Sequence, residues 1–375
     1  MKRNWCSMVF LLPFSGVLLA ADTGIEGSIA QSVSYDDNFL FRETAEDTWI
    51  YTLTPQLTGY YRTPIYTSAL NGAVEISRHS SFSRYDRNNP RLNWQQSWLR
   101  PRAAYNLGVG YQRADQRSEA VDDLGDFTTR SRVTTYSITP SYLYQWSERD
   151  TLTLAFSYVE RNYSGDSSSS DNQNYTLNSG WSHQMDERLA LRGNLSYTRY
   201  EADGRLTETQ SDIWRITGGA TYEWSERTTA TLLVGASWQE TRERIPLLSV
   251  EDKSTSTGSV ITLQWNHQSL IDSYSASFSR DLFPSSDGTV REQDRLTFGW
   301  GRPLSDVSRV SLNSNWLKST DDDRTREYFS LAPSYTHELS PDLSVTGRYD
   351  YKWQKRSDEG SVEGNVLRVN LVYQF

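Results

Sequence analysis

Apolar and polar residues alternate with a period of two through most of the chain. Within residues 366–375, VLRVNLVYQF, five apolar side chains share one face: Leu367, Val369, Leu371, Tyr373 and Phe375. Arg368, Asn370 and Gln374 fall on the other face, where Val372 is the one apolar exception. Because successive side chains of a strand point to opposite sides, this segment predicts a half-apolar β-strand. Such a strand fits a membrane barrel or the edge of a soluble β-sandwich.

The same alternation predicts about eighteen strands, separated by residues that favour turns. The first two extend over residues 25–36 and 48–61. The pattern is weakest over residues 92–107, where Trp94 and Trp98 predict a short strand that turns at residues 100–103 into the next one. If this stretch did not hold two strands, the count would be sixteen, by the same periodicity.

The connections between the predicted strands are of two kinds. One kind is tight, at residues 146–149, 185–188, 224–227, 304–306 and 339–342. The other is longer and rich in Ser, Asp and Gly, at residues 115–130, 165–172, 242–254, 283–292 and 319–325. Short periplasmic turns that alternate with longer outer loops are typical of outer-membrane barrels. A β-propeller could share a repeat of roughly 35 to 45 residues, but its blades need several short strands, and these strands are long.

The first 21 residues predict a secretory signal peptide. Lys2 and Arg3 precede a mostly apolar run over residues 9–19, and Ala20 and Ala21 follow it. A basic start, a short apolar core and small residues at the end are the features of such a peptide. The apolar run is too short to span a bilayer. We expect cleavage after Ala20 or Ala21, which would also remove Cys6, the one cysteine of the sequence.

Composition narrows the class of protein further. Aromatic residues make up 13% of the chain, which argues against disorder. Abundant Tyr and Trp suit the interfacial girdles of a membrane barrel. The formal net charge of -9 argues against a nucleic-acid partner, which would require a basic face. We therefore predict one all-β domain over residues 22–375, a transmembrane antiparallel up-and-down β-barrel in the bacterial outer membrane, with both ends in the periplasm.

If the apolar face meets lipid, the opposite face lines the lumen. That face is rich in Ser, Thr, Asn and Gln, and it carries charges of both signs. The candidate lumen-lining charges are Glu26, Arg62, Glu75, Arg192, Arg215, Glu223, Arg295, Glu338, Arg348, Asp350, Lys352 and Arg368. A mixed, hydroxyl-rich wall suits polar solutes or a neutral or mixed-charge polymer, whereas a phosphate pore would be ringed with Arg and Lys. The alternative is that these charges pair across neighbouring strands and only hold the wall.

Signals for an enzyme are weak. The spacing of His79, His183, His267 and His337 matches no metal site. Ser and Asp are plentiful, but no motif positions a nucleophile. We therefore expect no catalytic residue, no metal and no cofactor.

The end of the first predicted strand reads Val33-Ser34-Tyr35-Asp36-Asp37-Asn38, and the second contains Tyr51-Thr52-Leu53-Thr54-Pro55. This opening resembles that of the β-barrel porin 2 type of outer-membrane barrel, which is associated with exopolysaccharide and exosortase-linked systems. The resemblance implies a channel that exports an exopolysaccharide, with periplasmic export components as partners. From the residues alone, Asp and Asn simply leave a strand and begin a turn. A general diffusion porin, or a scaffold barrel with a blocked lumen, are the alternatives.

The C-terminal strand resembles the signal that the barrel-assembly machinery reads in bacterial outer-membrane proteins, a last strand with alternating apolar residues that ends in an aromatic. The resemblance assigns this role to Leu367, Val369, Leu371, Tyr373 and Phe375. It implies the assembly machinery as a partner, and the apolar face of the strands predicts contact with outer-membrane lipid. The acidic runs Asp122-Asp123 and Asp321-Asp322-Asp323 suggest divalent cations that bridge lipopolysaccharide phosphates, and the alternative is that these runs are solvated loops.

Overall fold

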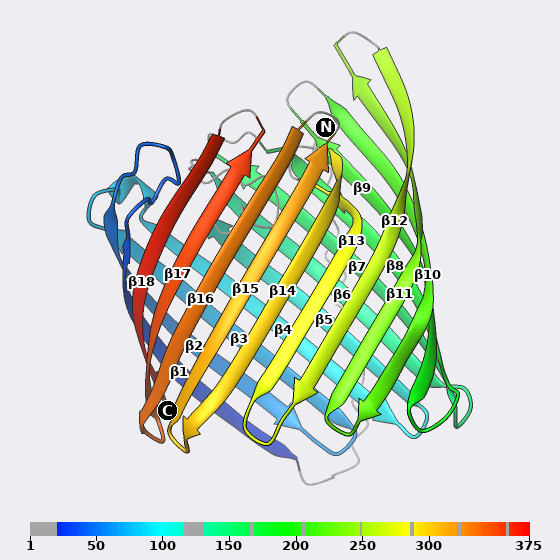
Figure 1. The fold of residues 1–375 in the computed structure, drawn as a ribbon, viewed down its shortest axis with the longest axis horizontal. Coiled ribbons are helices and arrows are strands. Elements are labelled where there is room, and N and C mark those ends of the chain that lie inside the picture. Colours follow the sequence, from blue (N-terminus) through cyan, green and yellow to red (C-terminus); the bar gives the residue numbers. More distant parts are fainter. Residues whose placement is uncertain are drawn as a thin grey trace.

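The computed structural model describes residues 21–115, 117, 131–165, 169–204, 207–247, 250–285, 289–321, 324–357 and 360–375. The predicted signal peptide lies almost wholly outside them. The described residues form one antiparallel sheet of eighteen strands that closes on itself (Figure 1). Its strands are β1 (Asp22–Asp36), β2 (Thr48–Arg62), β3 (Tyr66–His79), β4 (Arg87–Arg100), β5 (Ala103–Asp115), β6 (Arg132–Gln145), β7 (Asp150–Ser164), β8 (Asp171–Gln184), β9 (Leu189–Asp203), β10 (Glu208–Ser225), β11 (Thr228–Ile245), β12 (Val250–Gln268), β13 (Ser273–Pro284), β14 (Val290–Ser305), β15 (Ser308–Asp321), β16 (Arg324–Ser340), β17 (Leu343–Arg356) and β18 (Gly360–Gln374).

Each strand pairs with its neighbours in the sequence, and β1 also pairs with β18. The register of this closing seam runs from Ser28 opposite Gln374 to Asp36 opposite Val366. At its lower end, the backbone of Phe375 exchanges two hydrogen bonds with Gly27. The predicted barrel of eighteen strands is therefore confirmed, and the alternative of sixteen is wrong.

The expectation of a short fourth strand is also wrong. β4 has 14 residues and is as long as its neighbours. Its upper part contains Asn88, Asn89, Pro90 and Arg91, which alternate in no apolar pattern. Ladder pairing to β3 fixes these residues as strand, from Val74 opposite Pro90 to Ser77 opposite Arg87.

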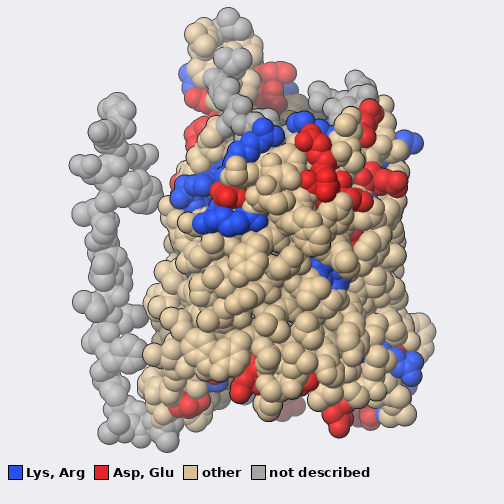
Figure 2. Space-filling view, turned by 90° about the vertical axis from the view of Figure 1, so that its left-hand side faces the viewer, with Lys and Arg blue, Asp and Glu red and all other residues tan. Residues whose placement is uncertain are grey.

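Alternation sorts the side chains between the two faces of the wall. Leu57, Leu154, Leu263 and Val369 point outward and are 45–56% exposed in the isolated barrel. Burial of one such side chain in lipid stabilises the inserted barrel by about 1.5–3 kcal/mol relative to leaving that side chain in water. Figure 2 shows a broad belt of uncharged side chains, with charged groups gathered towards the two rims. This belt is the surface that hydrocarbon covers in a transmembrane barrel.

The barrel has a short-turn end and a long-loop end. The described short connections, such as residues 63–65 and 146–149, lie at the same end as the first residue of β1 and the last of β18. At the opposite end the β11–β12 hairpin rises well above the rim (Figure 1). Its upper part pairs up to Ile245 opposite Val250. The expected long loop at residues 242–254 is thus mostly a paired ribbon, as is the one at residues 319–325.

Helical structure is sparse in the part of the chain described above. The 3-10 helix η1 (Ser83–Tyr85) lies between β3 and β4. Among the described residues, no helix has the length and apolar character needed to cross a membrane.

Candidate functional site

The first loop, residues 37–47 between β1 and β2, contains Phe39 and Leu40, which are only 3% and 1% exposed. They pack with Phe82 and Tyr85 from the β3–β4 connection. The ring of Phe39 stacks on Phe82 at 5.0 Å and meets the edge of Tyr85 at 5.2 Å. A loop rim that faced water would not hide its aromatic side chains in this way, so the loop is folded onto the barrel end.

The same loop also reaches the inner wall on the other side of the closing seam. Phe41 packs against Leu317 of β15 and Tyr328 of β16. Its backbone has a φ of 51°, which is unusual for a bulky side chain and marks a tightly specified turn. Phe39 contacts the β3–β4 connection while Phe41 contacts β15 and β16, so the loop lies across part of the mouth.

The Asp-Asp-Asn stretch fastens this loop to β18. Asp37 accepts hydrogen bonds from the backbone N–H of Asn365 at 2.6 Å and from its Nδ2 at 2.7 Å. Asn38 Nδ2 donates to the carbonyls of Arg42 at 2.7 Å and Glu363 at 2.9 Å. Asn38 Oδ1 accepts from the N–H of Arg42 at 3.0 Å. The motif therefore organises the first loop and ties it to the last strand.

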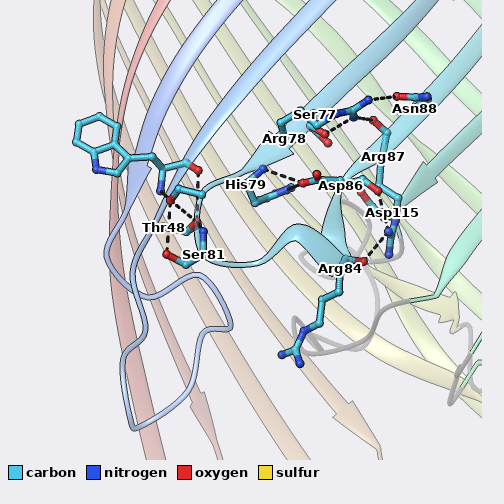
Figure 3. A network of polar contacts seen from close by, with 12 residues as sticks. Thr48, Ser77, Arg78, His79, Ser81, Arg84, Asp86, Arg87, Asn88 and Asp115 are labelled. Carbon is cyan, nitrogen blue, oxygen red and sulfur yellow. Dashed lines mark hydrogen bonds and ion pairs between the residues drawn. The ribbon is translucent and has the colours of Figure 1, made fainter.

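The β3–β4 connection that receives Phe39 is held by its own polar network (Figure 3). Asp86 accepts hydrogen bonds from the backbone N–H of His79 at 2.8 Å and contacts its Nδ1 at 3.2 Å. Arg87 Nε pairs with Asp115 at 2.9 Å, and its Nη1 donates to the carbonyl of Arg84 at 2.8 Å. These bonds fix η1, and with it the buried ring of Tyr85.

A cavity of about 650 Å³ lies beneath the first loop; we call it the lumen cavity. Its lining comes from β1–β3, from the end of β5, from β17 and β18, and from the folded connections: Ser32, Asp36, Phe39, Ile50, Thr52, Thr54, Glu75, Ser77, His79, Tyr85, Asp115, Arg117, Thr346, Arg348, Lys352, Val366, Arg368 and Asn370. The Arg117 guanidinium lies 3.7 Å from the centre of the Phe39 ring. Burial lowers the pKa of Arg117, and Asp36 opposes that shift.

A second inward structure lies at the long-loop end of β13. Pairing of β13 to β12 stops at Arg280, whereas its pairing to β14 continues to Pro284. Arg215 of β10 holds the released end, through an ion pair of 2.7 Å to Asp281 and a hydrogen bond of 2.6 Å to the carbonyl of Leu282. Beyond it, the Tyr200 hydroxyl donates to the carbonyl of Ser285 at 2.5 Å. The end of β13 therefore crosses the inner face of β11 and β12.

The structure places the charges expected in the lumen as follows. Glu75, Arg348, Lys352 and Arg368 line the lumen cavity, and Arg215 lines a smaller cavity of about 370 Å³ beside Asp281. Register and alternation put the others on the same inward face: Glu26, Arg62, Arg192, Glu223, Arg295, Glu338 and Asp350. Arg215 bridges to Asp281, and Arg348 pairs with Asp350 at 2.6 Å. Neither pair joins neighbouring strands, because Arg348 and Asp350 both belong to β17, whereas Arg215 and Asp281 belong to β10 and β13.

Several residues of this region have no signal in the strand pattern. Arg117 belongs to a long connection, and Asp281 belongs to a strand end, so alternation could not place either. Phe39, Leu40 and Phe41 carried the strongest available signal, because three consecutive apolar residues are unusual in a loop exposed to water. No group of three or more His, Cys, Asp or Glu side chains among the described residues could hold a metal ion.

Comparison with solved structures supports the fold. No protein-family model matches the chain, and no curated protein matches it in sequence. The ferric citrate transporter FecA in the unliganded form superposes with a TM-score of 0.53 at 10% identity, over 90% of this chain; the match spans only 60% of FecA. OpdK, an outer membrane protein of Pseudomonas aeruginosa, gives a TM-score of 0.49 at 8% identity, over 94% of this chain and 99% of its own. OccAB3 of Acinetobacter baumannii gives a TM-score of 0.46 at 12% identity, over 94% of this chain and 100% of its own. The chain has the fold of an outer-membrane β-barrel.

Proposed function

We propose that this chain is a channel of the bacterial outer membrane that carries a secreted polysaccharide. The observation that supports a channel is the closed wall of eighteen strands around a lumen lined by hydroxyl, amide and charged side chains. A barrel of this size is too wide for its wall side chains to fill. The polysaccharide is inferred only from the resemblance of the Tyr35–Asn38 stretch and its neighbours to the β-barrel porin 2 type. A general diffusion porin fits the same wall.

The orientation follows from the connections. We infer that the short-turn end, which holds both ends of the barrel, faces the periplasm and that the first loop lies at the extracellular mouth. A polymer that leaves the cell would then pass the lumen cavity and meet the first loop last. Secretion through a signal peptide and insertion by the barrel-assembly machinery are parts of the same proposal.

One observation favours a second candidate, a scaffold barrel with a blocked lumen. The first loop packs Phe39 on one side of the mouth and Phe41 on the other, and buried aromatic contacts of this kind hold a loop in place. If the loop never leaves this position, the barrel would present a plugged surface to periplasmic or external partners instead of a passage.

Two measurements separate these functions. Purified protein in a planar lipid bilayer should give discrete conductance steps if it is a channel, and none if it is a permanently plugged scaffold. Deleting the gene and staining cells for surface polysaccharide then separates an exporter from a general porin. Unchanged surface polysaccharide, together with slower uptake of small polar solutes, would replace the exporter with the porin.

A further inference from the structure

The inner face of β16–β18 carries arginines placed directly opposite one another. In the ladder between β17 and β18, Arg348 stands opposite Arg368. In the ladder between β16 and β17, Arg326 stands opposite Arg356. Both pairs, with Lys352 between them on β17, share the inward side by alternation. Like charges that face each other across a ladder are destabilising, so the Arg348–Arg368 pair at the lumen cavity is poorly explained by stability alone.

Carboxylates of the wall balance these cations only in part. Asp350 pairs with Arg348, through bonds of 2.8 and 2.6 Å to Nε and Nη2. Among the described residues, no carboxylate oxygen lies within 4 Å of the side-chain nitrogens of Lys352 or Arg368. Arg117 Nη1 is buried and has no hydrogen-bond partner within that part of the chain. All three of these cations line the lumen cavity, where Arg348 is the fourth cation and Asp36, Glu75 and Asp115 are the three carboxylates.

The rest of the lining suits a polyhydroxylated molecule. Thr52, Thr54 and Asn370 offer hydrogen-bond donors and acceptors. About 650 Å³ is within the range of cavities that bind small ligands. A carboxylate would fit between the cations, because charge-assisted hydrogen bonds to Arg and Lys are the strong ones.

We propose that the lumen cavity is a binding site for a saccharide that carries a carboxylate. Lys352 and Arg368 hold the carboxylate, assisted by Arg117 above them. Thr52, Thr54 and Asn370 hydrogen-bond the sugar hydroxyls. This proposal rests on the proposed function of a channel and adds a class of solute to it. The site selects acidic over neutral sugars among the solutes that reach the lumen.

Isothermal titration calorimetry on the purified full chain in detergent tests the site. Galacturonate is the probe, galactose is its neutral counterpart, and inorganic phosphate is an anion without a sugar ring. We expect galacturonate to bind about tenfold or more tightly than either comparison ligand, the contribution of a charge-assisted hydrogen bond. Equal affinity for galactose, or phosphate binding as tight as galacturonate, would overturn the proposal. These comparisons need no variant.

Variants locate the site. Lys352→Gln and Arg368→Gln should each weaken galacturonate binding about tenfold and leave the heat-modifiable migration of the barrel unchanged, because each removes a cation from a repulsive cluster. Lys355→Gln is the matched control, since Lys355 lies on the outward face of the same strand opposite Glu327. A loss of affinity in Lys355→Gln equal to that in Lys352→Gln would refute the placement.

Failure of this site and failure of the proposed function give different results. A barrel that conducts ions but does not distinguish galacturonate from galactose refutes the site alone. A barrel that binds galacturonate through Lys352 and Arg368 but gives no conductance supports the site and refutes the channel.

Discussion

Replacing Asn38 with alanine should release the first loop from the mouth of the barrel. Asn38 is only 5% exposed. Its side chain makes three hydrogen bonds, with Arg42 N–H, Arg42 C=O and Glu363 C=O. Only the bond to Glu363 joins the loop to β18, and a hydrogen bond contributes about 1 kcal/mol net, so the substitution should weaken docking of the loop by about 1 kcal/mol. Since about 1.4 kcal/mol changes an equilibrium tenfold, the undocked population should rise by roughly fivefold.

Single-channel recording measures this change directly. The Asn38→Ala barrel should open more often, or to a larger conductance, than the wild type. Asn38→Asp should lie between them, because it keeps the acceptor for Arg42 N–H and loses both donors. Asn106→Ala is the control, since Asn106 makes one 3.3 Å bond to Ser141 on the inner wall, far from the loop in the sequence.

The global stability of the barrel should not follow the loop. The ladders of eighteen strands are untouched by Asn38→Ala, so the temperature at which heat-modifiable migration is lost should stay within a few degrees of the wild type. Conductance identical to the wild type in both Asn38 variants would refute the reasoning that these hydrogen bonds control the mouth. Equal changes in Asn106→Ala would do the same.

Three further predictions follow from the wall. Cysteine at position 352 should react with a water-soluble thiol reagent in a Cys6→Ala background, whereas cysteine at position 349 should not; the reverse labelling would overturn the assignment of faces. Arg215→Ala should release the end of β13, because it removes the ion pair of Arg215 with Asp281 and its hydrogen bond to the carbonyl of Leu282, and single-channel conductance should therefore rise. An unchanged conductance would mean that the end of β13 does not narrow the path through the lumen. Phe375→Ala should lower the yield of assembled protein, whereas the barrel that does form should keep nearly normal heat stability. The reason is that burial of one lipid-facing aromatic contributes only ~1.5–3 kcal/mol to the stability of the barrel. A normal yield with a weakened barrel would contradict this prediction.

The strands could be predicted from the sequence because the membrane imposes the alternation. Val369 must face hydrocarbon and Arg368 must not, and a cation at the midplane of a barrel costs ~2–4 kcal/mol. The prediction failed where this constraint ends. Above the membrane both faces of the β11–β12 ribbon can be polar, so residues 242–254 carry no period of two and were expected to form a loop. Antiparallel pairing of β11 with β12, in which Arg242 lies opposite Lys253, makes these residues strand.

The folded loops lay beyond sequence reasoning for a different reason. Phe41 is in the first loop, but its contacts are Leu317 and Tyr328, far along the chain. Nothing local distinguishes an apolar loop residue that packs inward from one that touches a partner. The Asp37–Asn38 pair was expected to begin a turn, and it does so, but its bonds to Asn365 and Glu363 exist only because barrel closure brings β18 beside β1.

The acidity of the whole chain says little about the solute that it passes. The formal net charge of -9 adds together residues that never meet the same partner. On β16–β18 alternation sends Arg368 and Lys352 inward and Glu327 and Glu363 outward. Salt at physiological strength screens exposed charges beyond ~8 Å, and low-dielectric walls focus the field of the nearest groups. A solute in the lumen cavity therefore responds to the four cations and three carboxylates that line it and not to the net charge of the chain, so its preferred charge can be opposite to the one that the sum of the sequence would suggest.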